Sequence, residues 1–427
     1  MVGFLLTTTL PTWIAIAWRR CASGRSPRNE RREAPRSIVV IRLDQLGDLV
    51  LTTPLFRALK RSYPTARVSA LVLEELTPLL ATNRDVDEII PVRQTGARWL
   101  PARIRRLWSA VVVYFTRLFH RRFDLAICPR WDIDENFATM LCALTNAMRR
   151  VGYTSQATPA KARLNWGFDA AFDIVLPPGE VLHEADRSVA VVRALGGEGN
   201  SARPEIRVTD SDRRVAGRLL QYHDAQQFLI ALGIGARAMG RRWPVERYAR
   251  LVRALGRRWP VEAVIVCAEY EEKEAAALAK ELLVRPFVLC GEPLRSVCAV
   301  LEQCDLFVGN DSGAAHLAAA MSCPTVVVSR HPRDGAIDHP NSPARFAPRG
   351  GGRVIVVQPT SGMGSCKAFC RETEPHCILQ VTVDEVLTAS MKLLQESRLE
   401  ADRAHGRSRS GAKPHQHAAT SQAIREA

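Results

Sequence analysis

Short apolar runs rich in β-branched residues alternate with amphipathic stretches along most of the chain. Residues 37–43 (SIVVIRL) form the first run and predict a buried strand. A Gly-Asp turn follows this run and leads into a helical pattern. The further elements predicted for this half are a helix at 51–60, strands at 68–73, 88–91 and 124–128, and helices at 134–144 and 184–195. Such alternation predicts a parallel sheet wrapped by helices.

A second series of the same kind begins after residues 196–204 (GGEGNSARP), a segment rich in Gly, Ser and Pro that predicts a linker. The elements predicted in this series are strands at 228–232, 263–268, 306–308 and 325–329, and helices at 245–257, 271–283, 313–320 and 382–396. Two consecutive α/β units indicate two facing Rossmann-like domains with parallel sheets. Ligands of such sheets bind beyond the carboxyl ends of the strands, so we expect the site in the cleft between the domains.

These patterns divide the chain into four parts. We expect an N-terminal extension over 1–36, Rossmann-like domains over 37–200 and 201–396, and a disordered tail over 397–427. Residues 2–18 carry no charge and precede Arg19 and Arg20. Their number is at the short end of the ~17–25 residues that a spanning helix needs. Two interpretations stay open: an anchor that leaves the rest of the chain on the cytoplasmic side, or an over-extended start.

The chain is strongly basic, with a net charge of +15 over 427 residues. This excess attracts polyanions such as nucleic acid, phosphorylated glycolipid or an anionic membrane surface, although a solvated basic surface is an equal alternative. Residues 97–123 mix arginines with aromatic side chains. This segment either contacts a membrane or ligand phosphates, or forms an ordinary helix on the first domain. No nucleic-acid-binding module is recognisable, so nucleic acid is not an expected partner.

The eleven cysteines are scattered along the chain, which is typical of reduced thiols in a cytosol. Cys366, Cys370 and Cys377 lie close together in the sequence, and His376 adjoins the last of them. Their spacing lacks the paired C-x₂-C of standard zinc sites. We therefore expect structural thiols and no bound metal.

Three short motifs follow predicted strands and carry candidate chemistry. Residues 42–48 (RLDQLGD) place Asp48 at a Gly-Asp turn, where a carboxylate either caps the next helix or acts as a general base. Residues 308–316 (VGNDSGAAH) run from a strand through a turn into a helix. Asp311 is expected to cap that helix, whose first N–H groups would bind an anion, and His316 would donate to a phosphate. A capped helix with a buried histidine is the plain alternative.

The third motif, residues 233–244 (GIGARAMGRRWP), is a glycine-rich loop after a strand. Its N–H groups and the charges of Arg241 and Arg242 favour an anion. Its glycine spacing matches neither a Walker loop nor a dinucleotide-binding motif, and a flexible surface loop is the alternative. Together the motifs place a carboxylate on the first domain and two phosphate-type loops on the second.

These segments resemble family 9 of the glycosyltransferases, the heptosyltransferases of lipopolysaccharide core synthesis. The resemblance rests on residues 40–54 and 310–320, supported by Arg242-Trp243-Pro244 with Glu246 and by His376-Cys377. It implies a GT-B fold, in which the first domain binds the acceptor and the second binds a nucleotide-sugar donor. It also implies ADP-heptose as the donor and an inverting displacement that uses no metal or other cofactor.

The resemblance further implies roles for single residues. Asp48 resembles the family's catalytic aspartate, and Arg42 is expected to contact the acceptor. The expected donor-binding residues are Arg241, Glu272, Asp311, Ser312, Gly313 and His316. The family usually has Thr at the position of Ser312, and several members have Lys at that of Arg241. Glu271 and Glu274 are alternative matches for Glu272.

The expected function is therefore transfer of heptose from ADP-heptose to lipopolysaccharide core or a similar glycolipid. The expected location is cytoplasmic, and the cytoplasmic face of the inner membrane is a candidate partner through peripheral or N-terminally anchored attachment. One alternative is a transferase of the same fold with a different nucleotide-sugar donor or a protein acceptor. A more distant alternative is a basic nucleic-acid-binding protein.

Overall fold

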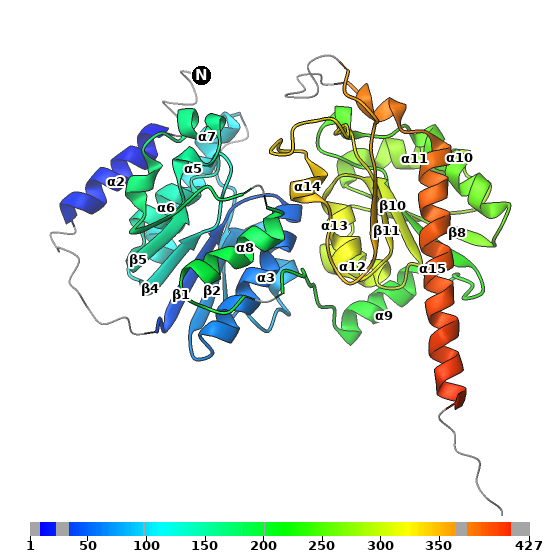
Figure 1. Cartoon of the computed structure of the whole chain (residues 1–427), viewed down its shortest axis with the longest axis horizontal. Helices are drawn as coiled ribbons and strands as arrows, with labels where there is room; N and C mark the ends of the chain where they lie inside the picture. Colours follow the sequence, from blue (N-terminus) through cyan, green and yellow to red (C-terminus); the bar gives the residue numbers. More distant parts are fainter. Residues whose placement is uncertain are drawn as a thin grey trace, which may run out of the picture.

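Two parallel six-stranded sheets lie side by side in the computed structural model, each covered by helices (Figure 1). The structure describes residues 9–22, 34–96, 99–180, 182–199, 201–363 and 374–410, with side chains described to residue 397. Within these residues the two sheets are built from separate halves of the chain, which confirms the expected α/β fold.

The first sheet has the strand order β3-β2-β1-β4-β5-β6, so β1 is central. Its strands are β1 Ser37–Arg42, β2 Arg67–Leu73, β3 Glu88–Val92, β4 Arg122–Cys128, β5 Asn146–Tyr153 and β6 Ile174–Leu176. Its helices are α2 Leu10–Ala22, α3 Leu46–Ser62, α4 Thr77–Leu80, α5 Ala102–Val113, α6 Ala138–Leu144, α7 Pro159–Leu164 and α8 Glu184–Ala194. Ile38 and Val40 of β1 pack towards α3, whereas Val39 and Ile41 pack towards α5 and α6. Helices on both faces explain why β1 is apolar throughout.

The second sheet has the order β12-β11-β10-β7-β8-β9, with β10 and β7 at its centre. Its strands are β7 Phe228–Gly233, β8 Val261–Cys267, β9 Phe287–Cys290, β10 Leu306–Asn310, β11 Thr325–Val328 and β12 Val354–Val357. Its helices are α9 Asp210–Leu219, α10 Val245–Gly256, α11 Glu272–Glu281, α12 Leu294–Leu301, α13 Gly313–Ala320, α14 Pro343–Phe346 and α15 Val383–Ser410.

Four strands were not predicted from the sequence, and three of them are short edge strands. β6, β9 and β12 have three or four residues each and lie at the outer edges of the sheets. The fourth, β5, carries Arg149 and Arg150 in its middle, which hides its apolar pattern. Only the neighbouring strand makes such segments regular, because it supplies their hydrogen bonds.

The last helix corrects the expected tail. α15 continues past Glu396 to Ser410, so the prediction of disorder is wrong for residues 397–410, while residues 411–427 lie outside the described part of the chain. Glu, Leu, Arg and Ala dominate residues 396–404, and these residues favour a helix once α15 has begun. The boundaries of the domains themselves remain predictions.

The N-terminal helix α2 is packed into the first half, beside α6 (Figure 1). Ile16 is only 1% exposed, and the ring centroids of Trp13 and Trp166 are 5.4 Å apart. Arg19 donates to the backbone carbonyl of Ala171 at 2.9 Å. The helix α2 is therefore docked on the first half through buried apolar and hydrogen-bonding contacts.

Candidate active site

The motifs from the two halves meet at the first turns of α3 and α13. A Cβ atom on Gly47 would lie 2.7 Å from Cδ2 of His316, so the imidazole rests against the Gly47 backbone. A Cβ atom on Gly313 would lie 3.0 Å from Cδ2 of Leu46. Both glycines allow this approach because they lack a side chain. The structure therefore brings the first two motifs together across the halves.

Asp48 lies in the first turn of α3 and is 16% exposed at its side chain. Its Oδ1 accepts from Nη2 of Arg42 at 3.2 Å, and Nη1 of Arg130 lies 4.0 Å away. Its Oδ2 accepts from the backbone N–H of Gln45 at 3.3 Å. One oxygen therefore caps the helix while the other faces two arginines, so capping does not rule out a second role.

The pKa values of Asp48 and Asp44 are shifted in opposite directions. Burial, reinforced by the negative charges of Asp44 and Asp132, raises the pKa of Asp48 despite the two arginines. Burial also opposes ionisation of Asp44, but Arg130 and Arg42 outweigh it and hold the pKa of Asp44 below its ordinary value. Asp44 therefore stays ionised, and Asp48 is the better proton acceptor of the two.

Arg42 does not face an open surface, contrary to its expected contact with the acceptor. It is 2% exposed, and its Nε lies 3.0 Å from Oδ2 of Asp44. With Asp48 on the other side, its guanidinium is held between two carboxylates. The reason is its place at the end of the central strand, where both faces of the sheet are covered. This geometry holds the guanidinium of Arg42 against the carboxylate of Asp48.

The turn before α13 differs from the expected cap. Ser312 occupies the N-cap position, and its side chain makes no capping hydrogen bond. Asp311 instead accepts from Nη2 of Arg241 at 3.2 Å, and Arg241 also donates to the side chain of Asn341. The prediction that Asp311 caps the helix is therefore wrong, because the arginine competes for its carboxylate. The start of α13 keeps N–H groups that can meet an anion.

His316 is buried one turn into α13. Burial lowers its pKa to about 4, so the imidazole is neutral at physiological pH. Its Nδ1 has no hydrogen-bond partner among the described residues. A neutral imidazole still donates through one nitrogen. The structure thus allows a phosphate contact but not a positive charge at this position.

Of the adjacent Arg241 and Arg242 in the glycine-rich loop, one is paired internally. Arg242 pairs with Glu271 at 3.0 Å and with Glu274 at 2.8 Å. Glu271 is buried against Gly235, where a Cβ atom would lie 2.0 Å from its Oε2. Glu272 begins α11 with an exposed side chain, so the structure does not bring it to this cluster. Arg241, in contrast, pairs with Asp311.

Asn310 joins the second and third motifs, a role that sequence reasoning missed. Its side chain is fully buried, accepts from the backbone N–H of Trp243 at 2.9 Å and donates to the carbonyl of Ile234 at 2.6 Å. The hydroxyl of Tyr248 also donates to it at 3.1 Å. A polar residue at the end of an apolar strand was the available signal, because a buried amide needs partners.

Arg345 of α14 ties the second half to the first and was also missed. Its side chain is fully buried and donates to Asp132 at 2.6 Å and to Glu184 at 2.9 Å. Its guanidinium carbon lies 4.5 Å from the ring centroid of Trp131. The partners are 213 and 161 residues away along the chain, so no local pattern could indicate them.

The model of glycosyltransferase family 9 (heptosyltransferase) matches residues 140–335, a span that includes α13 and its turn. Lipopolysaccharide heptosyltransferase 3 of Escherichia coli is 23% identical over 299 residues, which cover 69% of this chain and 82% of the relative. Over residues 140–335 the chain is similar to glycosyltransferase family 9.

Solved structures share the fold of this chain. A family 9 glycosyltransferase from Veillonella parvula superposes with a TM-score of 0.67 at 21% identity, covering 84% of this chain and 97% of the other. ADP-heptose lipopolysaccharide heptosyltransferase II of E. coli gives a TM-score of 0.60 at 18% identity, covering 85% and 99%. The fold is therefore GT-B, as the resemblance implied.

The chain was also predicted to hold no metal ion, and its N-terminal segment was a candidate membrane anchor. Among the described residues, no group of three or more His, Cys, Asp and Glu side chains is placed to hold a metal ion. Cys366 and Cys370 lie outside the described residues, and Cys377 is buried. No helix in the described ranges has the length and apolar character to span a bilayer.

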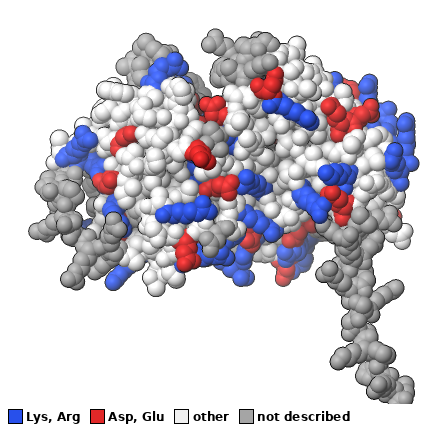
Figure 2. Space-filling model, in the orientation of Figure 1, with Lys and Arg blue, Asp and Glu red and all other residues white. Residues whose placement is uncertain are grey.

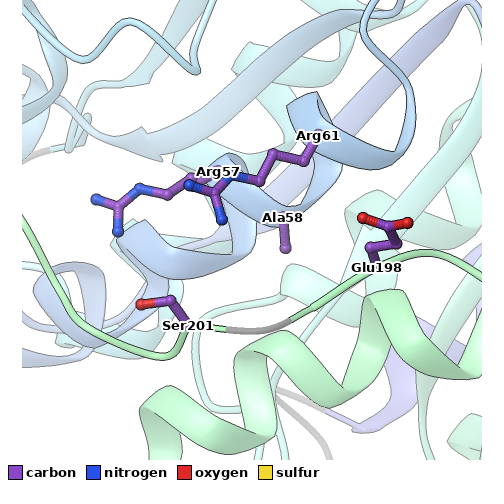
Figure 3. Close-up of a pocket in the computed structure, with 5 residues that line it drawn as sticks. All are labelled: Arg57, Ala58, Arg61, Glu198 and Ser201. Carbon is purple, nitrogen blue, oxygen red and sulfur yellow. The ribbon is translucent and has the colours of Figure 1, made fainter.

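A small pocket beside α3 lies apart from the Asp48 cluster (Figure 3). Arg57 and Arg61 border it on α3, opposite Glu198 and Ser201. Its volume of about 20 Å³ leaves room for about one water molecule. This pocket is therefore too small for a sugar or a nucleotide.

Proposed function

We propose that this glycosyltransferase moves heptose from ADP-heptose to a hydroxyl of lipopolysaccharide core, or of a similar glycolipid, with inversion and without a metal ion. The observation that carries the proposal is the contact between the first turns of α3 and α13, which sets Asp48 close to a free helix start. The names of the two E. coli proteins support ADP-heptose as the donor and lipopolysaccharide as the acceptor.

Asp48 acts as the general base in the proposed reaction. The acceptor oxygen bonds to the anomeric carbon of heptose while the bond from that carbon to the ADP oxygen breaks. Asp48 takes the hydroxyl proton, and ADP leaves with the bonding electrons. Attack from the side opposite to ADP inverts the anomeric centre. The raised pKa of Asp48 suits it to accept the proton, and Arg42 holds its carboxylate in place.

The departing diphosphate is stabilised by the second half. A helix end alone contributes ~0.3–1 kcal/mol, and up to ~2 kcal/mol when partly buried. The start of α13 at Ser312 and Gly313 therefore acts together with the charge of Arg241, whose side chain is 25% exposed, and with a hydrogen bond from His316. Asp311 orients Arg241. Glu272 stays a proposed nucleotide contact, with the buried Glu271 as the alternative.

A transfer assay with ADP-heptose and truncated lipopolysaccharides tests the base. We expect Asp48→Asn to lower the transfer rate by about 10²–10⁴-fold, because a positioned base contributes that much. The wild-type rate should fall as the pH drops through the raised pKa of Asp48, since the base must be ionised. Asp186→Asn, a half-exposed aspartate of the same half, serves as the control. Full activity of the Asp48→Asn protein would overturn the assignment.

Calorimetry with ADP, GDP and UDP separates this donor from the alternatives. Preferential binding of ADP supports the proposal, whereas tighter binding of GDP or UDP favours a transferase with another donor. Transfer that persists in excess EDTA supports metal independence. A rate that EDTA abolishes and Mg²⁺ restores would contradict it.

We also propose that the chain works in the cytoplasm at an anionic membrane surface, with α2 lying on it. Leu10, Ile14 and Trp18 recur on one side of α2 and are 50%, 60% and 50% exposed. Figure 2 shows largely uncharged surface over α2, with Lys or Arg at its outer end. An apolar row containing tryptophan beside basic residues is typical of a helix that lies in the interface of a bilayer.

Sedimentation with vesicles tests this surface. We expect binding to vesicles that contain anionic lipid, and a loss of about tenfold or more in Ile14→Asp or Trp18→Asp, because a charge is costly at the apolar side of an interfacial helix. Leu283→Asp changes a side chain of the second half that is 83% exposed and serves as the control. Equal binding of all three variants would refute the role of α2.

A further inference from the structure

A second cavity, of about 210 Å³, lies between the two halves beside the Asp48 cluster. It is bounded by residues that follow β1, β2 and β3, by α5, and by the glycine-rich loop of the second half. Gln45, whose N–H donates to Asp48, forms part of its wall. So does Asn136, whose side chain hydrogen-bonds to Asp44. A ligand in this cavity therefore lies next to the proposed base.

Two arginines reach this cavity from opposite halves. Arg106 comes from α5 and Arg237 from the glycine-rich loop. Among the described residues neither forms a salt bridge, although Arg42, Arg130, Arg241 and Arg242 nearby all do. Each guanidinium thus keeps the planar set of donors that suits a carboxylate or a phosphate.

The charges around Arg106 are mainly positive. Burial and the positive charges of Arg237, Arg103 and Arg105 lower the pKa of Arg106, although the negative charge of Glu135 opposes them. Glu75 also lines the cavity, but its side chain is exposed, so water screens its charge. Two like charges directed at one cavity repel each other, and an anion between them would relieve that repulsion.

We propose that this cavity binds an acceptor sugar that carries a carboxylate or a phosphate, and that Arg106 and Arg237 hold this anion together. The inference rests on the proposed transfer to a glycolipid. Gln45, Gln94 and Asn136 supply amides for the sugar hydroxyls. Because the arginines belong to different halves, the anion also links the halves around the acceptor. The acceptor therefore needs a negatively charged group in order to bind in the cavity, beyond any long-range attraction to the basic protein.

Calorimetry with delipidated core oligosaccharide and the full-length protein tests this binding without requiring transfer. We expect Arg106→Gln and Arg237→Gln each to raise the dissociation constant about ten- to hundredfold, the effect of losing a hydrogen bond to a charged group. Arg117→Gln changes an exposed arginine just after α5 and should leave the constant unchanged. Equal affinities of wild type and the two cavity variants, or no binding by wild type, would overturn the inference.

Binding of ADP keeps this inference separate from the proposed function. The cavity variants should bind ADP as wild type does, whereas absence of ADP binding in every protein would count against the donor proposal alone. Thermal unfolding provides the second readout. Removing one of two repelling charges should leave the melting temperature of ligand-free Arg106→Gln unchanged or higher, which a merely structural arginine would not do.

Two modified oligosaccharides identify the anion. One has its phosphates removed, and the other has its carboxyl groups reduced to alcohols. The ligand that lacks the recognised anion should bind wild type weakly, and Arg106→Gln should weaken it no further. An equal loss of affinity in Arg106→Gln for the native and for both modified ligands would show that the arginine recognises no anion.

Discussion

Replacing Gly47 with alanine should force apart the first turns of α3 and α13. The new methyl group would lie 2.7 Å from Cδ2 and 2.9 Å from Nε2 of His316. Favourable contacts between carbon atoms need about 3.5–4.0 Å. His316 is 6% exposed, so it has little space in which to move away. The substitution therefore probes the contact on which the proposed active site depends.

The magnitude follows from two opposing effects. Overpacking a buried contact costs about 1–3 kcal/mol. Glycine to alanine at a position that tolerates alanine stabilises by about 0.4–1 kcal/mol, through the unfolded chain. Gly47 is the second residue of α3 and does not have a positive φ, so its backbone tolerates alanine. We expect Gly47→Ala to lower the free energy of unfolding by about 1–2 kcal/mol, and to raise it by about 0.5 kcal/mol when His316 is also alanine.

Urea unfolding of wild type, Gly47→Ala, His316→Ala and the double variant measures the free energy of unfolding of each protein. It shows whether Gly47→Ala destabilises wild type but stabilises the His316→Ala protein. The interaction energy from the cycle should be about 1.5–2.5 kcal/mol. Small-angle X-ray scattering shows whether the halves part instead, because the radius of gyration would then rise in Gly47→Ala and return in the double variant. The same effect of Gly47→Ala in both backgrounds would refute the contact with His316.

Three further predictions address the rest of the molecule. Ile16→Ala should destabilise the protein by about 2–5 kcal/mol in urea, whereas Ile14→Ala on the same helix should change little, because only Ile16 is buried; equal effects would mean that α2 is not docked. Arg345→Met should cost about 3–5 kcal/mol, since two carboxylates lose their partner, against at most about 1 kcal/mol for Arg349→Met, whose pair is exposed. Urea midpoints of the two arginine variants decide this, and similar midpoints would contradict it. Because folding keeps His316 neutral down to about pH 4 while the unfolded chain gains a proton near pH 6.5, stability should fall as the pH decreases through this window. By pH 5 His316 should account for about 2 kcal/mol of that fall, so His316→Gln should show a shallower loss between pH 7 and pH 5.

The sequence predicted the central part of each half. β1, β2, β4, β7 and α13 lie where apolar periodicity placed them, within one or two residues at most ends. These elements are buried on both faces or packed on a sheet, so the periodicity of their residues reports their surroundings directly. The same holds for the motifs, since each follows a strand whose carboxyl end must face the cleft. The fold class and the segments that form the candidate site were therefore readable from local pattern.

Tertiary structure alone decided the partners of single side chains. The pattern around Asp311 allowed a helix cap, but Arg241 arrives from another loop and takes its carboxylate. Arg42 looked like an acceptor contact until Asp44 and Asp48 enclosed it. The contact of Gly47 with His316 and the cavity between Arg106 and Arg237 join residues from both halves. Periodicity describes only how residues near in sequence share a face, whereas charge pairing and close approach depend on which distant surfaces meet.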